Sequence, residues 1–178
     1  MLLSFVKLLI LAQRREGGEV MLSPDIDLVQ SAFFHAMAVG YAGAAERTTI
    51  PQLPGSKVIP FVWGDFKVVD LWLTTPYSPK SEGMTTIWFQ NNPVWVMHYG
   101  GRYHDIDIPF IKNCLHRAYV VERRFYGGRG PQFVRGERFT YINYIERNDF
   151  EKFFGEEVVF DLNESHSGHH WYRGQCLF

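Results

Sequence analysis

The alternation of apolar and polar residues is clearest in the middle of the chain, from Phe61 to Gly101. Because side chains of a strand point alternately to its two faces, this pattern predicts β-strands. Gly64-Asp65 and Asn91-Asn92-Pro93 interrupt it with residues typical of tight turns, and the Pro- and Ser-rich stretch from Thr74 to Gly83 predicts a loop. The pattern therefore predicts an antiparallel meander.

Apolar residues at helical spacing predict three helices. The first is an amphipathic N-terminal helix with Leu2, Phe5 and Leu9 on one side, and Gly17-Gly18 ends it. The second begins with Ser23 as N-cap, and the third runs from Asp105 to Val121. We expect residues 1–22 to be an N-terminal helical extension and residues 23–178 to be a single α+β domain. The amphipathic face of the first helix suggests a homodimer contact.

The end of the chain resembles its middle. Residues of similar type lie 73 positions apart, namely Asp70 and Asn143, Tyr99 and Tyr172, and Gly101 and Gly174. This spacing predicts internal repeats at about 54–101 and 127–174. The expected fold is an α+β curved antiparallel sheet of two duplicated helix-plus-three-strand units, with the helices packed on one face. Chance similarity between strands, and a partly closed barrel gripping a helix, are the alternatives.

Composition narrows the function. The chain has 178 residues, 46% hydrophobic and 16% aromatic, which suits one domain with a large core. With a net charge of -1, the protein has no overall positive charge that would attract nucleic acid or an acidic membrane, so we expect no direct binding of either. The apolar run from Leu8 to Ala12 is too short to span a bilayer. Two isolated cysteines, Cys114 and Cys176, predict reduced thiols in a cytoplasmic protein.

The aromatic content and the repeats predict a cleft that binds a small molecule or a peptide without catalysis. Its expected ligand-binding residues are Asp70, Trp95, His98, Tyr99, Glu157 and Tyr172. Each tryptophan and tyrosine also fits an ordinary place in the core. The alternative is a hydrolase or isomerase in which His98 pairs with Asp70 or Glu157 as acid and base, which requires those side chains within hydrogen-bond reach.

Two polar segments suggest other chemistry. His166, His169 and His170 have spacing that could bind zinc, but adjacent strand residues point to opposite faces, and a polar hairpin loop explains them equally. The segment from Gly127 to Gly130 is basic and glycine-rich, yet it follows a helix and lacks the lysine of a phosphate-binding loop. We therefore expect no metal and no cofactor.

Several short motifs resemble an uncharacterised bacterial domain family that occurs alone or C-terminal to a repressor-type helix-turn-helix domain. They are Tyr41-Ala42-Gly43, Pro54-Gly55-Ser56-Lys57, Gly64-Asp65-Phe66, Asp70, Pro93 to Gly100, Arg129-Gly130-Pro131 and Gly155-Glu156-Glu157. The resemblance runs from about Ala32 to Gly174, implies a regulatory role, and supplies no catalytic residues. His98 stands where the family usually has Asn. No helix-turn-helix pattern precedes Ser23, so any effect on DNA would be indirect.

Overall fold

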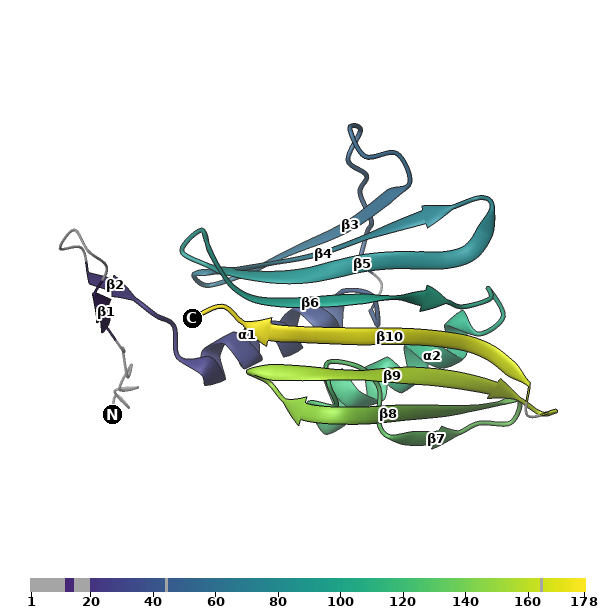
Figure 1. Cartoon of the computed structure of the whole chain (residues 1–178). Coiled ribbons are helices and arrows are strands. Elements are labelled where there is room, and N and C mark those ends of the chain that lie inside the picture. Colours follow the sequence, from purple (N-terminus) through teal and green to yellow (C-terminus); the bar gives the residue numbers. More distant parts are fainter. Residues whose placement is uncertain (1–11, 15–19, 44, 164) are drawn as a thin grey trace, which may run out of the picture.

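One eight-stranded antiparallel sheet dominates the computed structural model, which describes residues 12–14, 20–43, 45–163 and 165–178 (Figure 1). The strands are β3 (Ser56–Trp63), β4 (Phe66–Thr75), β5 (Ser78–Phe89), β6 (Asn92–Arg102), β7 (Phe133–Arg135), β8 (Phe139–Asp149), β9 (Lys152–Asp161) and β10 (His166–Cys176). Their order in the sheet is β3-β4-β5-β6-β10-β9-β8-β7. The two halves of the chain therefore meet at the centre, where Tyr99 of β6 lies opposite Tyr172 of β10.

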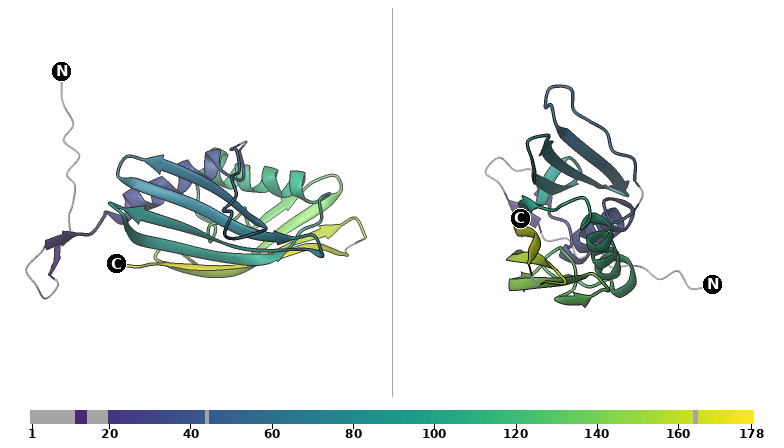
Figure 2. Two further views of the ribbon diagram at one scale, coloured as in Figure 1. Left: turned by 90° about the horizontal axis from the view of Figure 1, so that it is seen from above. Right: turned by 90° about the vertical axis from the view of Figure 1, so that its right-hand side faces the viewer.

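The helices lie against one face of this curved sheet (Figure 2). They are α1 (Ile26–Val39) and α2 (Ile108–His116), and α2 continues directly into the π-helical segment η1 (Arg117–Glu122). Helix α1 contacts β3, β4 and β5, whereas α2 contacts β8. The two helices thus cover different halves of the same face.

Helix α1 shows how the sequence sets an element. The carboxylate of Asp25 accepts a hydrogen bond from the backbone N–H of Asp27 at 2.8 Å, so Asp25 is the N-cap and the predicted cap at Ser23 is wrong. The helix buries an apolar stripe that includes Val29, Phe33 and Met37. It ends at Gly40, where the backbone N–H bonds to the carbonyl of Ala36 at 2.8 Å.

The predicted architecture of two duplicated helix-plus-three-strand units is wrong, because each half adds four strands to one continuous sheet. The prediction missed β7 and the part of β3 before Phe61, which are the two edges of the sheet. Pro60 lies inside β3, and proline is tolerated there because β3 is an edge strand of the sheet. Strand β7 has three residues, too few to show an alternating pattern.

The expected N-terminal helix is not seen in the described part of that segment. Strands β1 (Ala12–Arg14) and β2 (Val20–Leu22) pair antiparallel in a separate two-stranded sheet. Residues 1–11 and 15–19 lie outside the described ranges, and with them the apolar positions on which the homodimer prediction depends. No helix in the described ranges is both long and apolar enough to cross a membrane.

An aromatic cluster forms the core between α1 and the sheet. The ring centroid of Phe33 lies 5.2 Å from that of Trp95 and 5.8 Å from that of Tyr119. Trp95 also stacks on Phe150 and Phe153, with its centroid 5.2 Å from each. Burying a side chain such as Phe33 stabilises the fold by about 1.5–3 kcal/mol. This cluster fixes α1 and so fixes one wall of the cavity described next.

Candidate functional site

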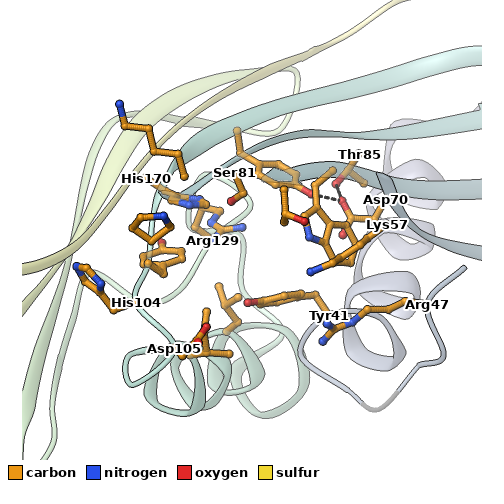
Figure 3. A pocket seen from close by; sticks show the side chains of 18 of the residues that line it. Tyr41, Arg47, Lys57, Asp70, Ser81, Thr85, His104, Asp105, Arg129 and His170 are labelled. Carbon is orange, nitrogen blue, oxygen red and sulfur yellow. Dashed lines mark hydrogen bonds between the residues drawn. The ribbon is translucent and has the colours of Figure 1, made fainter. Parts of the chain in front are cut away.

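A cavity of about 620 Å³ lies between the helices and the sheet (Figure 3). Its apolar wall is supplied by aromatic and aliphatic side chains of α1, the sheet, α2 and η1, namely Met37, Tyr41, Trp72, Met97, Leu115 and Tyr119. Four polar side chains that are almost fully buried also line it, and they are Asp70, Thr85, Arg129 and His170. A mostly apolar space with a few buried polar groups is the usual character of a ligand site.

Asp70 forms one polar end of the cavity. Its Oδ1 accepts hydrogen bonds from the hydroxyl of Tyr99 at 2.7 Å and from the hydroxyl of Thr85 at 2.8 Å. For Oδ2 no hydrogen bond is found among the described residues. Burial raises the pKa of Asp70, although the two hydroxyls and the charge of Arg129 oppose this effect. Asp70 can therefore accept a hydrogen bond, or donate one when protonated, to a molecule in the cavity.

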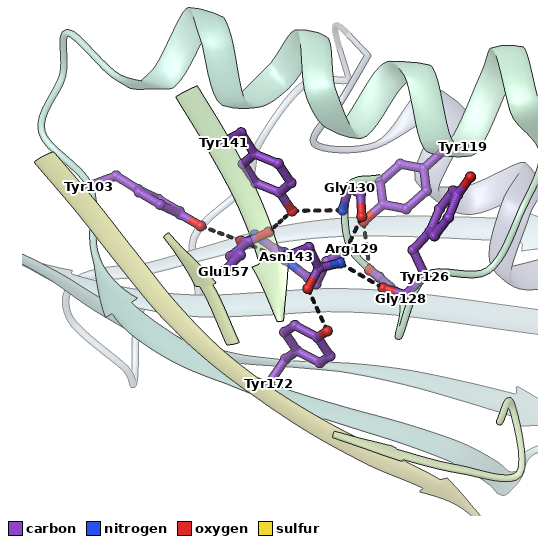
Figure 4. A network of polar contacts seen from close by, with 10 residues as sticks. All are labelled: Tyr103, Tyr119, Tyr126, Gly128, Arg129, Gly130, Tyr141, Asn143, Glu157 and Tyr172. Atoms are coloured by element: carbon purple, nitrogen blue, oxygen red, sulfur yellow. Dashed lines mark hydrogen bonds and ion pairs between the residues drawn. The ribbon is translucent and has the colours of Figure 1, made fainter. Parts of the chain in front are cut away.

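Arg129 is held in the cavity wall by a buried ion pair with Glu157 (Figure 4). The Arg129 Nε donates to Glu157 Oε1 at 2.8 Å, and Nη2 donates to the same oxygen. The hydroxyls of Tyr103 and Tyr141 donate to the two oxygens of this carboxylate. Burial would raise the pKa of Glu157, but the charge and hydrogen bonds of Arg129 outweigh it and hold that pKa below its usual value.

The glycine-rich loop brings Arg129 to this position. Gly127 has φ +64° and lies so close to Tyr172 that an added Cβ would be 2.5 Å from its ring. Only glycine allows that approach with that backbone conformation. The Asn143 side chain donates to the carbonyl of Gly130 at 2.7 Å, and the Tyr119 hydroxyl donates to the carbonyl of Gly128 at 2.7 Å. The loop is therefore fixed by the sheet and η1 rather than left in solvent.

His170 forms the second polar end. It is 4% exposed, and its ring stacks on Tyr103 with 4.0 Å between centroids. Neither Nδ1 nor Nε2 has a hydrogen-bond partner within the described residues. Burial, followed by the positive charge of Arg129, lowers the pKa of His170 to about 3. The ring is therefore neutral near pH 7, with one nitrogen able to donate and the other able to accept.

The comparison with family models identifies the domain. Residues 78–175 of the 178-residue chain match a family described as a domain of unknown function, DUF5680. The chain belongs to the DUF5680 family. Arg129, Glu157 and His170 lie inside the matched region, whereas Asp70 lies before it. No curated protein and no solved structure matches the chain.

In this DUF5680 domain, the predicted ligand-binding residues separate into four groups, of which His98 is the last. Asp70 and Tyr99 line the cavity. Glu157 is 0% exposed and reaches the cavity through Arg129 and Tyr103, which it holds and which line the cavity. Trp95 and Tyr172 are buried in the core, where the Trp95 Nε1 donates to the carbonyl of Phe150 and the Tyr172 hydroxyl donates to Asn143.

His98 lies on the opposite face of the sheet. It is exposed, and its neighbours in the register are Met84 and Arg173, whereas the adjacent residue Tyr99 points into the cavity. Consecutive residues of a strand face opposite sides. The acid–base pair of His98 with Asp70 or Glu157 therefore does not form.

The histidines near the C-terminus do not gather around one point. His169 is partly exposed and its Nε2 lies 2.9 Å from the carboxylate of Glu156, whereas His170 is buried on the cavity side. The side chain of His166 lies outside the described part of the molecule. Over the residues that the structure does describe, no group of three His, Cys, Asp or Glu side chains could hold a metal ion.

Sequence reasoning missed Arg129 and His170 as cavity residues. Arg129 looked like part of a solvent loop, because no apolar pattern marks a loop that folds back under a sheet. The spacing of His170 from His166 and His169 instead suggests a zinc site. The signal that could have found it is its two-residue spacing from Tyr172, since both then share the buried face of β10.

Proposed function

We propose that this domain binds a small organic molecule in the cavity between the sheet and the helices. The observation that carries the proposal is His170, whose two ring nitrogens are buried beside the cavity without a partner in the described residues. Leaving a buried donor or acceptor unpaired costs about 1–3 kcal/mol, so proteins seldom keep one without a use. A bound molecule, directly or through an ordered water, would supply the missing partner.

Asp70 supports the same proposal from the other end of the cavity. Its Oδ1 is satisfied by Tyr99 and Thr85, which fixes the carboxyl group and leaves Oδ2 for a ligand. Preorganised polar groups of this kind favour binding because their ordering cost is already met on folding. The cavity volume of about 620 Å³ falls within the range of about 300–1,000 Å³ typical of small-molecule sites. This size favours a small molecule over a peptide.

The regulatory role implied by the family resemblance, with its bacterial, DNA-binding relatives, belongs to the same proposal. Met37 and Tyr41, in α1 and just after it, line the cavity, so a ligand would contact that segment directly. Ligand-dependent protection of α1 from hydrogen exchange tests this, and unchanged exchange would remove the basis for signalling. Cys114 and Cys176 are both free, which supports the proposed cytoplasmic location.

A thermal-shift screen of small organic molecules tests the binding function. Ser81 lines the cavity on β5, and Ser81→Trp places a large side chain in that space. Its neighbour Glu82 is exposed, so Glu82→Trp is the matched control. Compounds that stabilise the native protein should also stabilise Glu82→Trp and should lose their effect on Ser81→Trp. Equal stabilisation of both variants would place the compounds elsewhere and overturn the proposal.

A further inference from the structure

We infer that the ligand is a small organic anion whose acidic group binds at Arg47, Lys57 and Lys112, with its apolar body extending into the cavity. This inference rests on the proposed function and specifies the chemical class of the ligand. It is carried by Arg47 and Lys57, which line one side of the cavity, and by Lys112, which lies over the Tyr41 ring, rather than by the buried polar groups.

The cations gather around two aromatic rings of the cavity wall. The guanidinium carbon of Arg47 lies 5.9 Å from the ring centroid of Tyr41 and 5.7 Å from that of Trp72. The Lys112 Nζ lies 5.2 Å from the same Tyr41 ring. Lys57 lies beside Arg47 and Tyr41 on this side of the cavity (Figure 3). Three positive groups therefore surround one aromatic wall.

These cations have no anionic partner of their own. None of Arg47, Lys57 and Lys112 takes part in an ion pair within the described ranges of the chain. Burial, and then the charge of Arg47, lowers the pKa of Lys112. Like charges held together repel, and an anion placed between them relieves that repulsion. Three cations beside one aromatic wall suit an anionic group.

The rest of the cavity specifies the body of the ligand. Tyr41 and Trp72 meet edge to face with 6.0 Å between centroids, which forms an aromatic wall next to the cations. Two acids line the cavity as well, but Asp105 is exposed and Asp70 is deep and already holds two hydroxyl donors. The acidic group of the ligand would therefore bind Arg47, and a hydrogen-bond donor elsewhere on the same molecule would bind the Asp70 carboxyl group.

Two fluorescent probes separate the anion from the apolar body. The first is 8-anilinonaphthalene-1-sulfonate, and the second is N-phenyl-1-naphthylamine, which has the same rings and the same N–H but no sulfonate. Titration of the native protein should give tighter binding of the sulfonate. Added salt should weaken binding of the sulfonate only, because salt screens exposed charges.

Arg47→Gln combined with Lys112→Gln removes two of the cations. We expect it to weaken sulfonate binding by about fivefold or more and to leave the neutral probe unchanged. The control is Lys67→Gln combined with Arg138→Gln, which also removes one lysine and one arginine that lie over aromatic rings, here Trp88 and Phe139. Neither control residue lines the cavity, so both probes should bind the control as they bind the native protein.

The inference is overturned if the Arg47 and Lys112 variant binds the sulfonate as the native protein does, if both probes weaken equally, or if the sulfonate does not bind. The proposed function fails separately. If Ser81→Trp abolishes binding of both probes while the charge variants change nothing, the cavity binds ligands but not through an anion. If Ser81→Trp changes neither probe, the cavity is not their site, and both proposals fall.

Discussion

Removing the cation of the buried Arg129–Glu157 pair should strongly destabilise the domain. Arg129→Met takes away two N–H donors and the only positive charge paired with Glu157 in the described residues, and Glu157 is 0% exposed. The hydroxyls of Tyr103 and Tyr141 remain, but they do not neutralise a charge. Breaking a buried pair in this way costs about 3–5 kcal/mol.

This loss is large compared with the stability of a typical domain, about 5–15 kcal/mol. The midpoint of thermal unfolding should fall by about 6–20 °C, since about 1 kcal/mol corresponds to about 2–4 °C for a chain of this size. Urea unfolding followed by tryptophan fluorescence gives the free energy of unfolding directly. Arg117→Met is the control, because Arg117 pairs with Glu122 at 2.6 Å on the surface and its loss should cost less than about 1 kcal/mol.

The defect of Arg129→Met should depend on pH. In the native protein the folded-state pKa of Glu157 is lowered, so its contribution to stability is present above the unfolded pKa and is lost as pH falls through the folded pKa. Without Arg129, burial raises that pKa, and protonation relieves the penalty. The difference in stability between the two proteins should therefore shrink from about pH 7.5 to about pH 5.

A double variant separates charge from packing. Arg129→Met combined with Glu157→Gln removes both charges, so it should be more stable than the sum of the two single variants predicts, by more than about 1 kcal/mol. The reasoning is refuted if Arg129→Met loses less than about 1 kcal/mol, or if its loss is the same at both pH values.

Three further predictions concern other residues. Asp70→Asn should stabilise the domain against urea at pH values above the folded-state pKa of Asp70 and have little effect below it. The pKa of Asp70 is raised on folding, so ionisation of this group lowers the stability of the native protein as pH rises. A stabilisation confined to acid pH would contradict this. Gly127→Ala should lower the midpoint of thermal unfolding more than Gly64→Ala does. Both glycines have positive φ, where alanine costs about 1–2 kcal/mol, but only at Gly127 would the added Cβ also meet the Tyr172 ring. Equal losses would refute the account of the loop. His98→Asn should leave probe affinity unchanged within error, and a loss of affinity would show that the outer face is involved.

The elements that alternate strongly could be predicted from sequence, because their pattern is local. Gly64-Asp65 joins β3 to β4, and Asn91 lies at the turn before β6, as the turn chemistry indicates. The stretch from Thr74 to Gly83 looked like a loop because it is polar. Only Pro76 and Tyr77 form a turn, because β4 runs to Thr75 and β5 begins at Ser78, at an end of the sheet where polar residues suit a strand.

The cavity could be predicted only in part. Asp70 and Tyr99 were expected near a ligand, and both line the cavity. Arg129 and His170 could not be placed there, since their positions depend on which elements a loop and a central strand pack against. The same limit applies to the sheet as a whole: offsets between similar residues suggested three-strand units, but the number of strands depends on edge pairing.

The most direct test of the proposed site is a crystal structure of the protein grown with 8-anilinonaphthalene-1-sulfonate. The account predicts electron density for the naphthalene rings beside Tyr41 and Trp72, the sulfonate against Arg47, and the anilino group directed toward Asp70 or His170. Probe density only on the outer face near His98, or a cavity filled by collapsed side chains of α1, would contradict it.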